Sequence, residues 1–514
     1  MLVGEILSEQ RSDRACLIGE DRTWTYAELD DLANRFVHQY LRCGLNPGDR
    51  VSLIVGNEPM LLAAYFGAWR AGLVANPVNN RLTADEIAYI LEHAGSRCVV
   101  VSDEFVDVCL KARSGMSSPF EWVLSLGQRR VTDVRAADRA SLMAQPASRI
   151  RSVAPRAEDG ALLLYTSGTT GRPKGVLLTQ HNLAAGTELV RSGFEIASSE
   201  RTLCVMPLFH TNGLMFSNLP FLSAGAAVVL RQRFSASAFW SQCDEHAVTS
   251  ASVSPTILAM LLEHQARAPA SAPRLLQYIK VASAPTPAEL ADRFERRFGN
   301  GLLLETYGLT ETSPVSTLNP PRGRRKRPSI GQALAPQEVR VVDAEGTQVE
   351  AGVVGEIEIR GPTLMKSYFR DPDATRAALH DGWLRTGDMA RSDADGFFFI
   401  VGRKKEMILR GGENISPLEI EQAAAAHPQV REAAAVGLPD RIWGETVALC
   451  VVGAPGLTEE ALRAHLSAQL SAFKLPSRIA FVEALPRNAM GKLLRGAARE
   501  LLTQALTPAD RQRA

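Results

Sequence analysis

The stretch Leu162–Leu178, LLLYTSGTTGRPKGVLL, is the part of the sequence that is most informative about the fold. An apolar run leads into the ten residues Thr166–Gly175, and a second apolar run follows them. These ten residues include four hydroxyl side chains, three glycines and Lys174. Because glycine lets the backbone curl, N–H groups can converge on an anion, while the hydroxyls add neutral donors and the lysine adds charge. The composition therefore indicates a phosphate-binding loop.

This loop is not a Walker A motif, in which Ser or Thr directly follows the lysine. Here Lys174 follows Pro173 and precedes Gly175. Near the C-terminus Gly491-Lys492 fails the same test, because Leu493 comes next. The sequence thus predicts a phosphate site of another kind.

Upstream of the loop, helical and extended patterns alternate, and one helix between successive strands predicts βαβ units and a parallel sheet. The residue before the first helix, Thr25, is its expected N-cap. A second series of this kind is expected from about Leu162 to Pro314. The predicted N-terminal elements are a helix at Thr25–Leu45, a strand at Asp49–Val55, a helix at Pro59–Ala71, an extended segment at Leu73–Pro77, a helix at Ala84–Ala94 and a strand at Cys98–Ser102. Residues 129–157 are expected to form a surface connection.

Downstream of Gln337 the pattern becomes rich in strands. Glu338–Val342 and Glu356–Arg360 alternate as half-buried strands do, and Gly396–Val401 is an apolar strand. A compact α+β pattern follows Arg403, so we expect an N-terminal domain of residues 1–403 and a C-terminal domain of residues 404–514. Its predicted elements are helices at Pro417–Ala426 and Glu459–Leu470 and strands at Ala433–Val436 and Thr446–Val452.

Composition excludes several classes of protein. The 514 residues carry 57 basic and 56 acidic side chains, a balance that gives no reason to expect a nucleic-acid partner. The seven cysteines are dispersed without a CxxC pair, which favours buried thiols in a reducing compartment over a zinc site. With no apolar run near the ~18 residues of a membrane span and no signal-peptide pattern, a cytoplasmic protein is expected. The basic stretch Pro320–Pro328 is expected to be a solvated loop, with a phosphate-facing role as the alternative.

Further motifs follow the glycine-rich loop in a fixed order. They are MPLFHTNG at Met206–Gly213, VASAP at Val281–Pro285, ETYGLTET at Glu305–Thr312, WLRTGD at Trp383–Asp388, GRKKEMILRGGENISP at Gly402–Pro417 and PRNAMGKLLR at Pro486–Arg495. Together they resemble the class I adenylate-forming superfamily of acyl-CoA synthetases, adenylation domains and luciferases, over about Thr25–Arg495. The resemblance implies an α/β fold: a large N-terminal domain of two β/α sheets plus a distorted β-barrel, and a small mobile C-terminal α+β domain.

The same resemblance implies an ATP site. Glu311 would bind Mg²⁺, Thr310 would reach the α-phosphate, and Asp388 would accept hydrogen bonds from both ribose hydroxyls. Lys492 is the implied catalytic lysine and Lys405 the implied hinge. The remaining implied residues are Thr166, Ser167, Gly168, Thr169, Thr170, Gly171 and Lys174 on the phosphates, Ala284, Pro285, Tyr307 and Gly308 at the adenine, Arg403 at the ribose or phosphates, and Gly411 and Gly412 along the pantetheine tunnel.

An acyl pocket is implied beside the nucleotide, with His210 as a gating and candidate catalytic residue. Its expected lining is Phe209, His210, Gly213, Ala282, Ser283 and Val315. This lining is small or apolar and carries no Lys or Arg, and a desolvated second carboxylate would need a charged partner. An aliphatic medium- or long-chain acid, or an aryl monocarboxylic acid, is therefore favoured.

The implied reaction has two steps. A carboxylate and Mg·ATP give acyl-AMP and pyrophosphate, and CoA then displaces AMP after the small domain turns about Lys405. Alternatives remain: a stand-alone enzyme that loads a carrier protein's pantetheine, a small dicarboxylate–CoA ligase, a non-catalytic nucleotide sensor, and a luciferase-like monooxygenase. The expected partners are the acid, ATP and CoA, with a homodimer left open.

Overall fold

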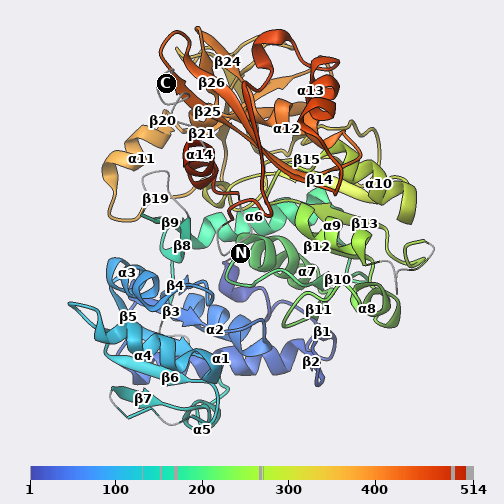
Figure 1. Cartoon of the computed structure of the whole chain (residues 1–514). Helices are drawn as coiled ribbons and strands as arrows, with labels where there is room; N and C mark the ends of the chain where they lie inside the picture. The colour runs from blue at the N-terminus through green and yellow to red at the C-terminus, as the bar shows by residue number, and fades with distance from the viewer. Residues whose placement is uncertain are drawn as a thin grey trace.

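The computed structural model describes residues 2–129, 131–132, 134–150, 153–166, 172–264, 269, 271–487 and 493–504. Two groups of expected site residues lie outside these described residues: Ser167, Gly168, Thr169, Thr170 and Gly171 of the phosphate loop, and the expected catalytic Lys492. In Figure 1 the chain forms a large N-terminal part, and the residues coloured orange to red form a smaller unit at its upper end.

The first sheet contains the predicted βαβ units. Its strand order is β19-β9-β8-β4-β3-β5-β6-β7, and β8, β4, β3, β5, β6 and β7 run parallel. The helix that precedes β3 begins after Thr25, whose side chain forms a capping box with Glu28, as the N-cap prediction required. The elements are α1 (Tyr26–Arg42), β3 (Arg50–Ile54), α2 (Pro59–Arg70), β4 (Val74–Pro77), α3 (Ala84–Ala94), β5 (Ser96–Val101), α4 (Val106–Ser114), β6 (Trp122–Ser125), β7 (Arg135–Ala137), β8 (Gly160–Thr166), β9 (Lys174–Thr179) and β19 (Ser367–Tyr368).

The expectation that Leu162 opens the second series is wrong. Hairpin β8–β9 completes the first sheet, because β8 pairs in parallel with β4 at Ala75–Leu162. The expected surface connection 129–157 also contributes structure, since β7 extends this sheet and α5 (Arg139–Met143) follows it. The two ends of the expected phosphate loop, Thr166 and Lys174, therefore belong to the first sheet rather than to the start of the second.

The second sheet has the order β16-β15-β14-β13-β12-β10-β11-β1-β2. Strands β14, β13, β12, β10, β11 and β1 run parallel, so the carboxyl ends of the central strands meet at one edge. Its elements are β1 (Ala15–Ile18), β2 (Thr23–Thr25), α6 (Gln180–Gly193), β10 (Arg201–Cys204), the π-helix η3 (Asn212–Asn218), α7 (Leu219–Ser223), β11 (Ala227–Leu230), α8 (Phe239–Glu245), β12 (Ser250–Val253), α9 (Pro255–Glu263), β13 (Tyr278–Val281), α10 (Ala288–Phe298), β14 (Leu303–Tyr307), β15 (Thr317–Leu318) and β16 (Gln332–Ala333).

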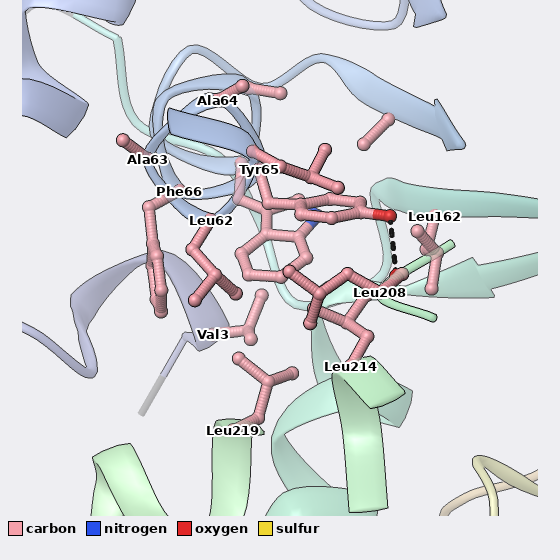
Figure 2. Packing of buried hydrophobic residues seen from close by; sticks show 14 of the residues in the cluster. Val3, Leu62, Ala63, Ala64, Tyr65, Phe66, Leu162, Leu208, Leu214 and Leu219 are labelled. Atoms are coloured by element: carbon pink, nitrogen blue, oxygen red, sulfur yellow. Dashed lines mark hydrogen bonds between the residues drawn. The ribbon is translucent and has the colours of Figure 1, made fainter. Parts of the chain in front are cut away.

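A continuous hydrophobic core joins the two sheets. Helix α2 is buried along its length, and its Tyr65 hydroxyl donates a hydrogen bond to the Leu208 carbonyl at 3.0 Å (Figure 2). Leu214 of η3 and Leu219 of α7 pack on the other side of the same cluster. This contact fixes the backbone immediately before Phe209 and His210, which the sequence assigned to the acyl pocket.

An antiparallel sheet follows, with the order β17-β18-β21-β20 and with β22 paired to β21. The alternation expected for Glu356–Arg360 is wrong, because both Glu356 and Glu358 are buried along with their apolar neighbours. Glu358 accepts bonds from Arg340 and Arg385 at 2.7 and 3.2 Å, which explains how a buried carboxylate is tolerated. The elements are β17 (Glu338–Val342), β18 (Gly355–Arg360), α11 (Pro372–Ala378), β20 (Leu379–His380), β21 (Trp383–Ser392) and β22 (Phe398–Arg403).

We expect Glu358→Ala to lower the free energy of unfolding by about 3 kcal/mol, because it leaves two arginines without their buried partner. Glu338→Ala is the matched control, since Glu338 pairs with Arg360 on the same sheet but both side chains are about half exposed, at 57% and 45%. Glu338→Ala should lower the free energy of unfolding by less than about 1 kcal/mol. Urea unfolding followed by tryptophan fluorescence measures both, and equal losses would contradict the assignment of Glu358 as a buried ion-pair centre.

The C-terminal unit is a second antiparallel arrangement, with the order β24-β23-β26-β25 and with β27 parallel to β26. Helices α12 and α13 pack against its sheet around Ile420 and Leu462. The fold class expected from the sequence, an α/β protein with a large N-terminal and a smaller C-terminal α+β part, is confirmed. The elements are η6 (Lys404–Glu406), β23 (Ile408–Arg410), β24 (Glu413–Ile415), α12 (Pro417–Ala425), β25 (Val430–Asp440), β26 (Gly444–Gly453), α13 (Glu459–Ser467), β27 (Arg478–Phe481) and α14 (Arg495–Gln504).

Other features expected from composition can be compared with the structure. All seven cysteines are buried free thiols, as predicted, and burial raises the pKa of Cys109 and Cys243 to about 12. The basic stretch Pro320–Pro328 is only partly solvated: Lys326 pairs with Asp393 and Asp395, and other cations of the stretch pair with acids of α10 and the β21–β22 turn. Within the part of the chain that the structure describes, no helix is long and apolar enough to cross a bilayer.

Candidate active site

The base of the phosphate loop is a regular hairpin. Thr166 ends β8 and pairs across the hairpin with Lys174, which begins β9. The Lys174 Nζ lies 5.1 Å from the centre of the Tyr368 ring, on the short strand β19 that pairs with β9. The lysine is therefore held at the mouth of the loop against an aromatic face.

Tyr368 connects this lysine to the expected magnesium ligand. Its hydroxyl donates to Glu311 Oε1 at 2.9 Å, and the backbone N–H of Met365 donates to the Glu311 carbonyl at 2.8 Å. Burial, and then the Glu311 charge, raise the pKa of Tyr368, so its hydroxyl stays protonated and keeps donating. Thr310 and Glu311 form the 3₁₀ turn η5 (Thr310–Thr312) directly after β14.

A buried carboxylate, Asp388, forms the second centre of the site. It is 5% exposed and accepts from the Tyr307 hydroxyl at Oδ2, 2.7 Å away, and from Arg403 Nε at Oδ1, 2.8 Å away. Asp388 and Arg403 are cross-strand partners on β21 and β22. Although burial opposes the charge of Arg403, the negative charges of Asp388, Glu406 and Glu311 raise the pKa of its guanidinium, so it stays charged beside Asp388.

Close backbone packing orients the segment that carries Tyr307 and Glu311. A Cβ at Gly308 would lie 2.0 Å from the Pro314 carbonyl oxygen, so only glycine fits there. The expected adenine wall, Ala284 and Pro285, is exposed after β13 at the carboxyl edge of the second sheet. Ligands of open parallel sheets bind at such edges.

The expected acyl-pocket residues come from the loops after β10 and β13, from the start of η3 and from the segment between β14 and β15. Phe209 is buried, His210 is partly buried, and burial lowers the pKa of His210 to about 4, so the imidazole is neutral at pH 7. A Cβ at Gly213 would lie 2.1 Å from the Pro207 carbonyl oxygen. The other expected members are the partly buried Ala282, the exposed Ser283 and Val315, which is buried in the large core.

The segment around Lys405, the expected hinge, is tied to both structural units. Lys404 pairs with Glu356 of β18 at 2.9 Å, and the other oxygen of Glu356 accepts from the N–H of Gly387 at 3.0 Å. Two residues after Lys404, Glu406 pairs with Arg495 of α14 at 2.8 Å. Lys405 lies between these two ion pairs.

The glycine pair expected along the pantetheine tunnel forms the turn between β23 and β24. Gly411 and Gly412 both have positive φ, at +59° and +89°. The Gly411 N–H donates to the Trp443 carbonyl at 2.7 Å, and a Cβ at Gly411 would lie 2.8 Å from the Trp443 ring. Trp443 is half exposed beside this turn.

The donor set around Glu311 suits Mg²⁺. The Oε1 atom of Glu311 accepts from Tyr368, and the described residues contain no group of three acidic, His or Cys side chains that would enclose a metal. Mg²⁺ keeps several waters and is bound by one or two carboxylates together with substrate phosphates, so a single carboxylate is enough. Such an ion would add positive charge to the phosphates, and Tyr368 would orient its carboxylate ligand.

We expect Tyr368→Phe to raise the Mg²⁺ concentration for half-maximal pyrophosphate release about tenfold. Replacing a residue that hydrogen-bonds to a metal ligand commonly lowers metal affinity about 10- to 100-fold. Phe369→Leu on the neighbouring position, which keeps the β19–β9 pairing, is the control. Titration of Mg²⁺ at saturating ATP is the measurement, and unchanged Mg²⁺ dependence in the Phe variant would show that Tyr368 does not orient the ligand.

Comparisons with known proteins identify the family to which this site belongs. The family model described as AMP-binding enzyme matches residues 5–369, and the AMP-binding enzyme C-terminal domain matches residues 419–492. The chain belongs to this AMP-binding, adenylate-forming family. It is an AMP-forming acid–thiol ligase that uses ATP and CoA as co-substrates together with Mg²⁺. The expected domain boundary at 403/404 falls between the two matched segments and stays a prediction.

The relatives are CoA ligases. The sulfoacetate–CoA ligase of Cupriavidus necator is 38% identical over 95% of this chain and 95% of its own length. The oxalate–CoA ligase of Arabidopsis thaliana is 35% identical over 94% of each chain. The crystal structure of ATP-bound MatB from Rhodopseudomonas palustris superposes with a TM-score of 0.89 at 29% identity, covering 98% of this chain and 99% of that chain.

The contacts form two groups: Lys174 and Glu311 both meet Tyr368, and Tyr307 and Arg403 both meet Asp388. The roles expected for these residues stay predictions. Sequence reasoning missed Tyr368, Glu356 and Lys404, which connect or support these residues. Tyr368 gives little signal because a two-residue strand has no periodicity to detect. Glu356 is a charged residue in a strand predicted to be half-buried, and Lys404 is a charged residue beside the expected hinge. Their charge was the only signal, because the residues they pair with lie far away in the sequence.

Proposed function

We propose that this ligase activates a compact monocarboxylic acid that carries a neutral hydrogen-bonding group, and transfers it to CoA. The observation that carries the proposal is a polar network among the acyl-pocket loops. Asn212 Oδ1 accepts from the Ser252 hydroxyl at 2.7 Å, and Asn212 Nδ2 lies 3.4 Å from Ser283 Oγ. These groups bond to one another, and the exposed Ser283, which accepts here, can also donate its hydroxyl hydrogen to a polar substituent, as it could not to a plain alkyl chain.

Two further observations support a compact, singly charged acid. Some of the relatives are named for crotonobetaine and carnitine, and two are named for sulfoacetate and oxalate, which are small acids. Their second acidic group would need a cation, yet the expected pocket segments carry no Lys or Arg and the neighbouring Lys280 is turned toward a backbone carbonyl and aromatic rings. The neutral His210 adds a hydrogen-bonding group without adding charge.

The nucleotide site supplies the first half-reaction. A carboxylate oxygen of the acid attacks the α-phosphorus of ATP, the bond to the β-phosphate oxygen breaks, and pyrophosphate leaves. Lys174 and the loop it closes would bind the β- and γ-phosphates, Asp388 would bind the ribose, and Tyr307 would flank the adenine. Little covalent chemistry is left to the protein, so positioning and charge neutralisation account for most of the catalysis.

The second half-reaction uses the small domain. The CoA thiol attacks the acyl-AMP carbonyl, the bond to the phosphate oxygen breaks, and AMP leaves. We propose that the domain turns about Lys405 between the two steps, so that Lys492 serves the first and the Gly411–Gly412 turn serves the second. The glycines suit a thin thiol arm because they leave space where side chains would stand.

A panel of acids with pyrophosphate release as the readout, with and without CoA, tests the proposal. It should contain glycolate and 3-hydroxypropionate, with oxalate, malonate, octanoate and benzoate as the competing classes. We expect the hydroxy acids to give the highest kcat/KM and to need CoA for continued turnover. ADP and orthophosphate as products would overturn the reaction type, whereas a preference for oxalate or malonate would overturn the substrate class alone.

A medium-chain aliphatic acid is the second candidate, because Phe209 and Val315, both expected to line the pocket, are apolar and buried. Octanoate in the panel separates the two candidates. Replacing CoA by a phosphopantetheinylated carrier protein tests the remaining acceptor, and faster transfer to the carrier would reassign the thiol substrate.

A further inference from the structure

Lys280 is a wholly buried cation for which the mechanism above has no use. It lies in β13 with 0% exposure, and in the described part of the chain no carboxylate lies within ion-pairing distance of its Nζ. The Nζ donates to the Phe216 carbonyl at 3.0 Å and faces the rings of Phe194, Phe216 and Phe221, whose centres are 5.4, 4.7 and 4.7 Å away. Burial lowers the pKa of Lys280 to about 7, partly offset by Cys204 and Glu200.

The acceptor of this bond belongs to the π-helix η3. A π-helix is rare and is frequently found at functional sites. A second side chain, that of Asn218 within η3 itself, donates from Nδ2 to the Gly213 carbonyl at 2.6 Å. Two side chains therefore satisfy carbonyl groups of η3, and the Lys280 bond joins it to the neighbouring sheet.

The opposite end of η3 reaches the acyl-pocket loops. Asn212, its first residue, is bonded to Ser252 of β12 and lies against Ser283 after β13. Ser283 has a φ of +78°, a left-handed conformation that costs energy for a residue with a side chain and clusters at functional sites. The β13 segment thus contacts η3 twice, through Lys280 near the end of the strand and through Ser283 just beyond it.

We infer that Lys280 is a positioning residue for the acyl pocket: it holds the π-helix against β13 and so fixes Asn212 and Gly213 where they meet the substrate acid. Lys280 does not touch the substrate and acts through the Phe216 carbonyl. The inference rests on the proposed function for its effect on the acid, whereas the contact between Lys280 and η3 is independent of it.

Lys280→Met tests the inference because it keeps the length and the apolar stem and removes the donor. We expect KM for the preferred acid to rise about tenfold while KM for ATP stays unchanged, since one hydrogen bond to a buried carbonyl is lost. The thermal midpoint should stay the same or rise, because a buried charge without a carboxylate partner is replaced by an apolar group. A purely structural lysine would instead lower the midpoint and affect both substrates alike.

Two variants serve as controls. Ile279→Val changes the adjacent residue, which is buried on the other face of β13, and should leave the ratio of the two KM values unchanged. Lys280→Gln keeps a neutral N–H donor and should recover part of the loss. If Gln behaves as Met does, the hydrogen bond is not what positions the pocket.

Hydrogen exchange of the segment Asn212–Asn218 gives a readout that needs no substrate. We expect its amides to exchange at least about tenfold faster in Lys280→Met than in the unchanged protein, and not in Ile279→Val. Unchanged exchange would overturn the inference even if the enzyme proved to act on another acid. Faster exchange with no pyrophosphate release from any acid would overturn the proposed substrate class and leave the positioning of η3 by Lys280 standing.

Discussion

Asp388→Asn is expected to lower kcat/KM for ATP in acyl-AMP formation by about 100-fold. The amide offers one acceptor oxygen where the carboxylate offers two, and Arg403 and Tyr307 already use both oxygens. Hydrogen bonds to charged groups are worth about 1.5–3 kcal/mol each, so losing one at the ribose together with the charge opposite Arg403 gives a loss of this size. ATP–pyrophosphate exchange measures the effect.

The choice of nucleotide makes this expectation specific to the ribose. The unchanged enzyme should discriminate strongly against 2′-deoxy-ATP, because a site built to bond a hydroxyl rejects the analogue that lacks it. Asp388→Asn should remove most of that discrimination. Asp395→Asn, in the exposed β21–β22 turn, is the matched control and should behave as the unchanged enzyme. Full discrimination in the Asp388 variant would place the ribose elsewhere.

Lys492→Ala is expected to reduce acyl-AMP formation by about 100- to 1,000-fold or more, as the loss of a positioned charge at the attacked phosphate does. Lys492 lies outside the described residues, and the assignment rests on the sequence motif Pro486–Arg495. Transfer of a supplied acyl-AMP to CoA should be spared, because the lysine is expected to be withdrawn in that step. Single-turnover assays of the two half-reactions separate these effects.

Two companion variants sharpen this test. Lys492→Arg keeps the charge and should retain part of the first half-reaction. Lys405→Pro stiffens the hinge segment and should show the reverse pattern, with acyl-AMP formed and thioester formation impaired. Equal losses of both half-reactions in Lys492→Ala would contradict the division of labour between the two domain positions.

The sequence predicted the regular elements well where periodicity and caps agreed. Helix α3 has the predicted bounds Ala84–Ala94, and Thr83 forms its capping box with Glu86. The predictions were wrong where partners are remote in sequence. The hairpin β8–β9 joined the first sheet because its partner β4 lies far upstream in the chain, and no local pattern encodes that pairing. Glu356 and Glu358 alternate with apolar residues, so the sequence predicts that they are exposed. They are buried, because each pairs with a cation that the local sequence does not reveal.

The site follows the same rule. Loops with several glycines and hydroxyls or with a fixed order of motifs could be singled out from the sequence, and the roles predicted for them stay predictions. In the structure Lys174 and Glu311 meet at Tyr368, and Tyr307 and Arg403 meet at Asp388. The supporting contacts could not be predicted, because Tyr368 meets Glu311 and Lys280 meets Phe216 across long stretches of chain. An isolated Tyr or a Lys in an apolar strand carries no signal of its partner.

Two ion pairs flank Lys405, the expected hinge. Lys404 is joined to Glu356 in the large domain, and Glu406 is joined to Arg495 in the small one. If the small domain turns about Lys405 with both pairs kept, the rotation would fall on the backbone torsions around Lys405 and on the side chains of Lys404 and Glu406. The torsional preferences of this short segment would then help to set how many orientations the small domain can visit.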